Sequence, residues 1–235
     1  MPPEAAGGLF SLLGVLQLAD SFFPSGRYTL SHGLESFVQC GWVEDPADLE
    51  ALIEEYLTAV VGGADAVAAA EAARCAAAAD VATIVEIDRR LHSMKLAHEA
   101  AVSSVRTGRQ LLATARGLCA SPPLERYADR VSASQAPGNH AVALGVFGAA
   151  WGLTPAEAAL VELYSFATGL LGAALRMLRL GHTQAQGILR RLGPSLDALA
   201  QQASCTSYED MRAFAPAVEI MQMRHERADV RLFAS

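Results

Sequence analysis

The 235-residue sequence has little of what several protein classes require. Charged residues make up 18% of it and the net charge is −7, so no excess of positive charge exists to bind the phosphates of nucleic acid. Alternating runs of β-branched residues, which are typical of half-buried strands, are nearly absent. The four cysteines lie far apart without a C-x-x-C pair, so we expect reduced thiols in a cytoplasmic protein. They are Cys40, Cys75, Cys119 and Cys205.

No segment predicts export or membrane insertion. The first basic residue is Arg27, so the apolar stretch from Leu9 to Ala19 has no charged region like that of a signal peptide. The longest uncharged run, from Val131 to Ala156, is interrupted near Pro137 and is too short to cross a bilayer. We therefore predict a cytoplasmic protein without membrane contact.

Apolar residues are abundant, at 52% of the chain with a mean hydropathy of +0.24. The length suits one large domain with a full core. Because so few residues are charged, we expect more apolar surface than that core can absorb, and an oligomer or a permanent partner would cover the surplus.

Apolar residues recur every three or four positions along almost the whole chain, which predicts an all-α fold. Asp45 is the predicted N-cap of a helix that starts at Pro46 and ends before Gly62 and Gly63. Other helices are predicted at residues 9–19, 31–40, 64–78, 81–118, 124–134, 141–151, 182–203 and 216–228. The stretch 81–118 has room for two helices. Breaks are predicted at 23–26, 121–123, 137–138 and at Gly193 and Pro194.

One predicted helix is apolar on nearly all sides. It begins with a capping box from Thr154 to Glu157, runs to Leu180 and is stopped by Gly181. A helix of this kind belongs at the centre of a bundle. Its small residues predict close approach of neighbouring helices; they are Gly169, Gly172, Ala173 and Ala174. The expected fold is a single-domain, multi-helix bundle of roughly ten helices around this helix, with 1–8 as a flexible N-terminus.

The sequence has no recognised catalytic motif, and we predict no catalytic residue and no metal ligand. Lys95, the only lysine, has no glycine-rich loop before it, so nucleotide hydrolysis by a phosphate loop is excluded. Neither Glu-x-x-His nor His-x-x-x-His occurs, and no G-x-S-x-G is present. Three histidine–carboxylate pairs at helical spacing could each supply half of a metal site or form ordinary surface contacts. They are Asp88/His92, His32/Glu35 and His225/Asp229.

The chain ends in large apolar residues where a frayed terminus is usually small and polar. Leu232 and Phe233 either fold back onto the chain's own core or are buried by another protein. Within the apolar helix, Arg176 needs a carboxylate or carbonyl partner, and we expect it chiefly to hold helices in register. Gly26 and Gly33 lie in a loop-to-helix transition that suits a surface contact or merely permits a turn.

Three segments together resemble the urease accessory protein F family. They are "LLGVLQLADSFFPSGRYTLSHGLESFV", "ALRMLRLGHTQAQGIL" and "PAVEIMQMRHERADVRLFAS". Weaker similarity fills the middle of the chain, at Glu99, Ser104, Gly108, Arg109 and His140, so the resemblance spans residues 12 to 235. The order of the segments and the shared end of the chain make it specific.

The resemblance implies an all-α homodimer that binds the accessory protein D or H and recruits the accessory GTPase G. This complex then meets the urease apoprotein, and GTP hydrolysis is coupled to nickel transfer. The chain would hold no cofactor of its own, because nickel only passes through the complex and the GTPase binds GTP. Residues 224–235 are implied to be the ordered partner-binding segment.

The residues implied to contact partners lie in three parts of the chain. They are Pro24, Gly26, Tyr28, His32, Gly33 and Glu35; Arg176, Gly181, His182 and Gln186; and Arg224, His225, Glu226, Arg231, Leu232, Phe233 and Ser235. Leu232 and Phe233 would be the buried anchors. The sequence departs from the family pattern at Asp229, usually tyrosine, at Ala234, usually arginine, and at His182, often glutamine.

Two other interpretations stay open. One is a helical metal-dependent hydrolase that uses His32, Glu35 and His225. The other is a purely structural helical oligomer. Because the histidines are scattered, we expect nickel to bind the isolated chain no more tightly than about tens of micromolar. We also expect docking and gating of the GTPase, not an inserted arginine.

Overall fold

Helices form where apolar residues recur at three- and four-residue spacing. A computed structural model describes residues 8–228 and 231–234, and within these ranges it has eleven α-helices and no strand. The predicted all-α, single-domain fold is confirmed. The helices are α1 (Leu9–Ala19), α2 (Leu34–Gln39), α3 (Pro46–Tyr56), α4 (Asp65–Ala77), α5 (Val81–Met94), α6 (His98–Leu118), α7 (Pro122–Ser132), α8 (His140–Ala150), α9 (Pro155–Met177), α10 (His182–Cys205) and α11 (Pro216–Glu226). Short helical turns are η1 (Arg27–Thr29), η2 (Leu57–Val61) and η3 (Tyr208–Asp210).

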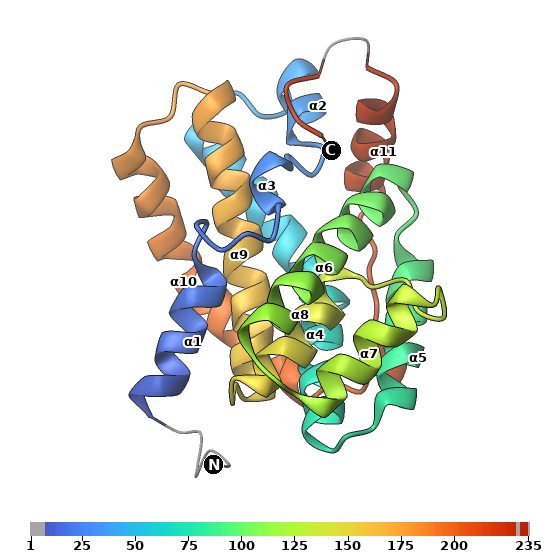
Figure 1. The fold of residues 1–235 in the computed structure, drawn as a ribbon. Helices are drawn as coiled ribbons and strands as arrows, with labels where there is room; N and C mark the ends of the chain where they lie inside the picture. The colour runs from blue at the N-terminus through green and yellow to red at the C-terminus, as the bar shows by residue number, and fades with distance from the viewer. Residues whose placement is uncertain (1–7, 229–230, 235) are drawn as a thin grey trace.

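The centre of the bundle is shared by α4, α8 and α9 (Figure 1). Every residue from Ala66 to Ala73 is buried, as is every residue of α8 from His140 to Gly148. A Cβ atom at Gly145 would lie 2.2 Å from the carbonyl oxygen of Ala69, so the backbones of α4 and α8 almost touch. The prediction of a single central helix was therefore incomplete.

The predicted capping box of α9 is confirmed, since Thr154 and Glu157 bond each other's backbone. The helix ends at Met177, however, and Gly181 is the N-cap of α10, not the stop of α9. Nothing lies within 4 Å of a Cβ atom built at Gly169 or Gly172, so close helix approach at these two residues was wrongly predicted for the single chain. Of the described helices, α9 alone is long and apolar enough for a bilayer, but 61% of that apolar window is buried in the bundle.

The predicted N-cap of α3 is also confirmed, because the Asp45 carboxylate accepts hydrogen bonds from Ala47 N at 2.8 Å and Asp48 N at 3.0 Å. After Tyr56 the helix widens into the π-helical turn η2. There the carbonyl of Ala59 accepts a hydrogen bond from Phe214 N at 2.9 Å, which ties the segment before α11 to the end of α3.

One predicted break is wrong, because α10 continues through Gly193 and Pro194. Proline removes one backbone hydrogen bond and crowds the preceding turn. Pro194 lies on the exposed side of α10, whereas Leu192 and Leu196 are buried in the bundle on either side of it. Water can satisfy the freed carbonyl on that side while the apolar contacts hold both halves of the helix. The stretch 81–118, in contrast, is divided into α5 and α6.

Candidate functional site

At one end of the molecule α11 packs against α2, which brings the C-terminal and N-terminal parts of the chain together (Figure 1). The contact depends on Gly33, the N-cap of α2, which has a φ of +84° that side chains rarely tolerate. A Cβ atom at Gly33 would lie 2.9 Å from Cγ of Gln222 and 3.2 Å from its backbone nitrogen. Glycine therefore lets α11 approach α2 closely.

His225 on α11 is enclosed by two carboxylates. Its Nδ1 lies 2.7 Å from Oε2 of Glu99 on α6, and its Nε2 lies 3.1 Å from Oε2 of Glu35 on α2. Only 1% of the His225 side chain is exposed, against 17% for Glu99 and 5% for Glu35. Ionised carboxylates only accept hydrogen bonds, so both contacts are satisfied when both ring nitrogens carry hydrogen, which is the positively charged form. One imidazole thus joins three helices.

The terminal segment closes over the same carboxylates. Arg231 forms an ion pair with Glu99, and Leu232 N donates to Oε1 of Glu35 at 3.0 Å. Glu35 therefore binds a side chain of α11 and the backbone of the terminal segment at once. We call the set Glu35, Glu99, His225, Arg231 and Leu232 the C-terminal latch.

Phe233 lies beneath the latch in the chain's own core, with 7% exposure. The guanidinium carbon of Arg176 on α9 lies 4.3 Å from the centre of its ring, a cation–π contact, and Ala234 N donates to the carbonyl of Thr29 at 3.0 Å. The expectation that a partner buries Phe233 is thus corrected for this chain, because its own helices already do so. Leu232, in contrast, is 72% exposed and remains available to a partner.

A cavity of about 90 Å³, lined by both apolar and charged side chains, lies beside α11, with Val218 and Gln222 in its wall. Glu162 Oε2 on α9 lies 2.9 Å from both Nη1 of Arg27 and Nδ1 of His140 at the start of α8. Lys95 forms a second ion pair in the cavity wall, 2.7 Å from Asp65. The buried charged groups Arg27, Glu162, Lys95 and Asp65 therefore each have an oppositely charged neighbour, which offsets the free-energy cost of burying them.

The cavity changes the ionisation of its groups. Burial alone would raise the pKa of Glu162, but the positive Arg27 and the His140 imidazole outweigh burial and hold that pKa well below its usual range. Burial, followed by the positive charge of Arg27, lowers the pKa of His140. Burial with Arg27 and Lys95 lowers the pKa of His32 to about 3. The His32 imidazole is therefore held neutral at neutral pH.

Among the residues that the structure describes, no group of three or more His, Cys, Asp or Glu side chains is arranged to hold a metal ion. Glu35 and His225 are brought together, but His32 lies in the cavity wall with its ring centre 4.7 Å from that of Phe166. The constellation of His32, Glu35 and His225 required for the hydrolase interpretation is therefore not formed.

The other two histidine–carboxylate pairs have different outcomes. Asp88 is fully buried and accepts hydrogen bonds from Tyr127, Gly138 and Asn139, at 2.7 to 2.9 Å. It anchors the turn before α8 and is neither a surface contact nor half of a metal site with His92. Asp229 lies outside the described residues, and the described partners of His225 are Glu35 and Glu99.

The remaining sequence-predicted residues are scattered around this end. Glu226 caps α6, since its Oε1 accepts from Glu99 N at 2.8 Å, and Arg224 is exposed. Pro24 and Gly26 are exposed in the loop before η1. Gly181, His182 and Gln186 are exposed at the start of α10. The side chain of Tyr28 and the whole of Ser235 lie outside what the structure describes. The partner-binding role of all these residues stays a prediction.

No pattern in the sequence predicts that Arg27, His140 and Glu162 meet. Arg27 and Glu162 are 135 positions apart. A single carboxylate in an otherwise apolar stretch of α9 was a usable signal, because a buried charge requires a partner. Nothing in the sequence identified which residue would provide it.

The outer face of α1 is apolar and exposed to solvent. Its buried side carries Ser11, Gly14 and Leu18, and a Cβ atom at Gly14 would lie 3.1 Å from Leu153 Cδ1. Large apolar side chains point outward instead. They are Leu9, Phe10, Leu12, Leu13 and Leu16, with exposures between 49% and 80%, followed in the next loop by Phe22. A surface helix normally has the reverse arrangement, so this face is suited to contact with another polypeptide.

Comparison with known proteins gives a consistent result. The family model named UreF matches residues 43–193. Urease accessory protein UreF of Trichodesmium erythraeum (strain IMS101) is 33% identical over 228 residues, covering 95% of this chain and 96% of that protein. Urease accessory protein UreF 2 of Brucella canis is 33% identical over 224 residues, covering 94% and 91%. Urease accessory protein UreF of Bacillus sp. (strain TB-90) is 30% identical, covering 95% and 99%.

Proposed function

Since the chain belongs to the UreF family of urease accessory proteins, we propose that it is a non-catalytic adaptor for nickel insertion into urease. In this role it binds the accessory protein D or H, recruits the accessory GTPase G and presents the assembly to the urease apoprotein in the cytoplasm. Nickel is the cargo of the assembly, and the chain holds no resident cofactor.

The observation that carries the proposal is the C-terminal latch. The latch holds residues 231–234 against α2 and α6, and it leaves the side chain of Leu232 exposed to solvent. Nearby on α11, Ile220 and Met223 are exposed by 55% and 39%. A partner that covers these side chains finds them already ordered, and pre-ordering lowers the entropy cost of binding. The accessory protein D or H is the partner proposed for this end.

The outer face of α1 supports the homodimer. Five large apolar side chains on eleven residues form a contiguous strip, and a second copy of the same strip would bury them. The two apolar surfaces lie at opposite ends of the molecule, so both partners can bind at once (Figure 1).

For the GTPase we propose gating by differential affinity. An adaptor shifts the equilibrium between the nucleotide states of the GTPase only if it binds one of these states more tightly than the other. The paired charges of the cavity and the C-terminal latch hold this end of the molecule in one arrangement, which favours one fixed binding geometry.

The test is co-purification with the accessory protein D or H and the GTPase. Deletion of residues 224–235 should abolish the complex, but it also removes His225 and leaves Glu35 and Glu99 facing each other. Leu232→Asp leaves the latch contacts in place and should weaken the complex at least tenfold. Leu118→Asp, the same change at an exposed site at the end of α6, is the matched control. Equal complex formation by Leu232→Asp and Leu118→Asp, with unchanged helical spectra, would refute the proposed end.

A further inference from the structure

Charge is unevenly distributed along this acidic chain. The whole sequence has 18 basic and 25 acidic residues. The stretch from Val81 to Gly138 has eight basic and five acidic ones, so it is net positive within a negative protein. It contains α5, α6, α7 and the turn before α8, which together form one side of the bundle (Figure 1).

Four of the five acidic residues in this stretch are already engaged elsewhere. Asp88 is buried beneath the turn before α8, and Glu99 belongs to the latch. Glu125 and Asp129 both form ion pairs with Arg116, at 2.7 and 2.5 Å. The fifth is Glu86, whose carboxylate accepts from Tyr208 Oη at 3.3 Å. Asp80, one residue before the stretch, lies near Arg126 and Arg130 and accepts a hydrogen bond from Thr83 Oγ1 at 2.6 Å.

Four exposed arginines of the same stretch donate hydrogen bonds to neutral acceptors. Arg89 donates to the carbonyl of Gln135 and Arg130 to its side-chain oxygen, both at 2.7 Å. Arg109 donates to Pro137 O at 3.2 Å and Arg126 to Pro122 O at 3.3 Å. Within residues 8–228 and 231–234 none of the four forms an ion pair, so each guanidinium keeps further N–H donors for a ligand.

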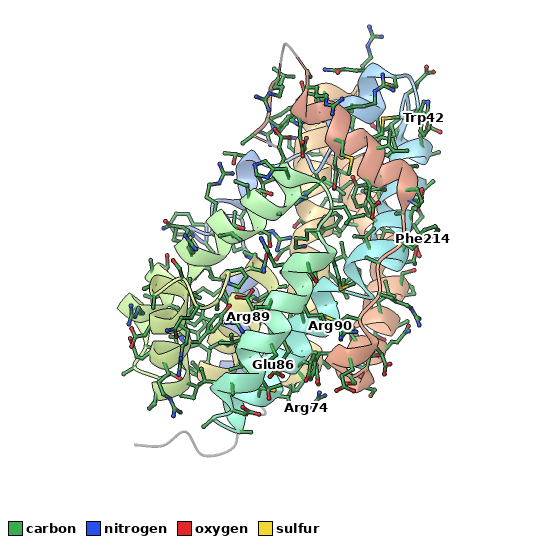
Figure 2. All side chains as sticks on the ribbon, turned by 90° about the vertical axis from the view of Figure 1, so that its right-hand side faces the viewer. Trp42, Arg74, Glu86, Arg89, Arg90 and Phe214 are labelled. Atoms are coloured by element: carbon green, nitrogen blue, oxygen red, sulfur yellow. The ribbon has the colours of Figure 1, made fainter. Side chains whose placement is uncertain are left out.

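Surface hollows join these residues into one line. Arg126 and Arg130 line a hollow beside the start of α5, Arg130 and Arg89 line the next one, and Arg89 and Arg109 line the third. We call Arg126, Arg130, Arg89 and Arg109 the arginine line. In Figure 2, Arg89 lies on the side of α5 nearer α7, whereas Arg90 lies on the side of the segment that leads to α11.

The surface between the arginines of this line is partly apolar. Val81, Ala82 and Val85 of α5 line the middle hollow. His92 lines the third hollow, and its buried Nδ1 has no hydrogen-bond partner among the described residues. A ligand for this surface therefore needs negative groups at intervals and small apolar groups between them.

We propose that the arginine line is a docking surface for an acidic segment of another protein. Planar guanidinium groups bind carboxylates through two parallel hydrogen bonds, and the apolar surface between the arginines accommodates aliphatic side chains between the carboxylates. Nucleic acid fits less well, because its continuous negative charge extends beyond the line and is repelled by the rest of a chain with net charge −7. The surface is separate from the latch and from α1, and the inference does not depend on the adaptor function.

The test measures binding of a fluorescent octaglutamate peptide to the full-length protein by polarisation at low salt. We expect saturable binding that weakens with added salt, and a loss of at least about tenfold in Arg89→Glu/Arg130→Glu. The matched control is Arg179→Glu/Arg190→Glu, which makes the same change of charge at exposed sites between α9 and α10 and on α10. It should lose less than about threefold.

Because Arg89 and Arg130 also hold the turn at Gln135, a second variant is needed. Arg126→Glu touches only its own helix backbone and should weaken binding about threefold with an unchanged helical spectrum. The proposal is overturned if octaglutamate shows no saturable binding, or if the control pair loses as much affinity as Arg89→Glu/Arg130→Glu. It is also overturned if an octathymidine oligonucleotide binds more tightly than the peptide and loses its affinity in the same variants.

Discussion

His225 is the residue on which the end of the chain depends, because it lies between carboxylates from two other helices. Removing one partner of a buried charge group costs more than the pair itself contributes, since the remaining charges lose their compensation. His225→Ala leaves Glu35 and Glu99 facing one cavity. We expect it to lower the free energy of unfolding by about 3 kcal/mol, measured by urea denaturation with circular dichroism.

Arg224 gives a matched control for this variant because it is the preceding residue on α11 and is exposed. Arg224→Ala should change the free energy of unfolding by no more than about 0.5 kcal/mol. If His225→Ala unfolds at the same urea concentration as Arg224→Ala, the latch does not stabilise the chain.

A second residue-scale prediction concerns pH. The pKa of His32 is about 3 in the folded chain, because of burial and then the charges of Arg27 and Lys95, and about 6.5 in the unfolded chain. Between pH 3 and pH 6.5, His32 is protonated in the unfolded chain but neutral in the folded chain. The free energy of unfolding therefore decreases as the pH falls from 6.5 toward 3. Glu162, whose pKa is also lowered, acts in the same direction below its usual value of 4.5.

The measurement is the free energy of unfolding between pH 7 and pH 4. His32 has a positive φ of 52°, which asparagine tolerates better than most residues, so His32→Asn removes the titrating group with little backbone strain. The wild-type curve should be steeper than that of His32→Asn by up to about 1.4 kcal/mol per pH unit below pH 6.5. Parallel curves would show that His32 is not held neutral by its surroundings.

Residues differ in how far their role can be predicted from sequence. The caps at Asp45 and Thr154 were predictable because each bonds to a backbone group within three residues. The contact of Glu35 with His225 spans 190 positions, and the local pattern around His225 carries no information about its partner. The family resemblance identified several of these residues but not their mutual contacts, and it implied that a partner buries Phe233, which this chain's own helices bury.

At the scale of elements, the closest packing is between α4 and α8, and it depends on Gly145. A Cβ atom there would lie 2.2 Å from the carbonyl oxygen of Ala69, and backbone cannot move aside as a side chain can. We expect Gly145→Ala to lower the free energy of unfolding by about 2 kcal/mol or more, although alanine is the better helix former. Thermal and urea unfolding followed by circular dichroism measure the loss.

The control is Gly117 on α6, where nothing lies within 4 Å of an added Cβ atom. Here only helix propensity acts, so Gly117→Ala should be neutral or raise the free energy of unfolding by up to about 1 kcal/mol. Equal effects of the two substitutions would contradict the close approach of α4 and α8.

The boundaries of elements show where local signals fail. Pro194 is a sound terminator by local rules, yet α10 continues through it because buried leucines on both sides hold the helix in place. Gly181 was expected to stop α9, but that helix ends four residues earlier and Gly181 begins α10. In both places the packing of neighbouring helices, which the sequence does not display, decided between alternatives that local patterns allowed.

For the whole molecule, composition predicted a surplus of apolar surface, and the structure locates it. α1 turns Ser11 and Gly14 toward α9 and its neighbours, and directs large apolar side chains outward. Such an orientation leaves apolar area in water without benefit to the single chain, so we expect another polypeptide to cover this face. A second copy of the chain, as proposed above, would bury two such strips in one isologous contact.

This orientation leads to a prediction about mass in solution. Leu13→Asp/Leu16→Asp places two charges on the outer face of α1 without touching its buried side, so light scattering should report the single-chain mass of 24.7 kDa in place of about twice that value for the unchanged protein. Leu96→Asp/Leu118→Asp changes two leucines that are 62% and 52% exposed on another side, and it should retain the larger mass. If both double variants keep the larger mass, α1 is not the dimer face, and its apolar strip must meet a different protein.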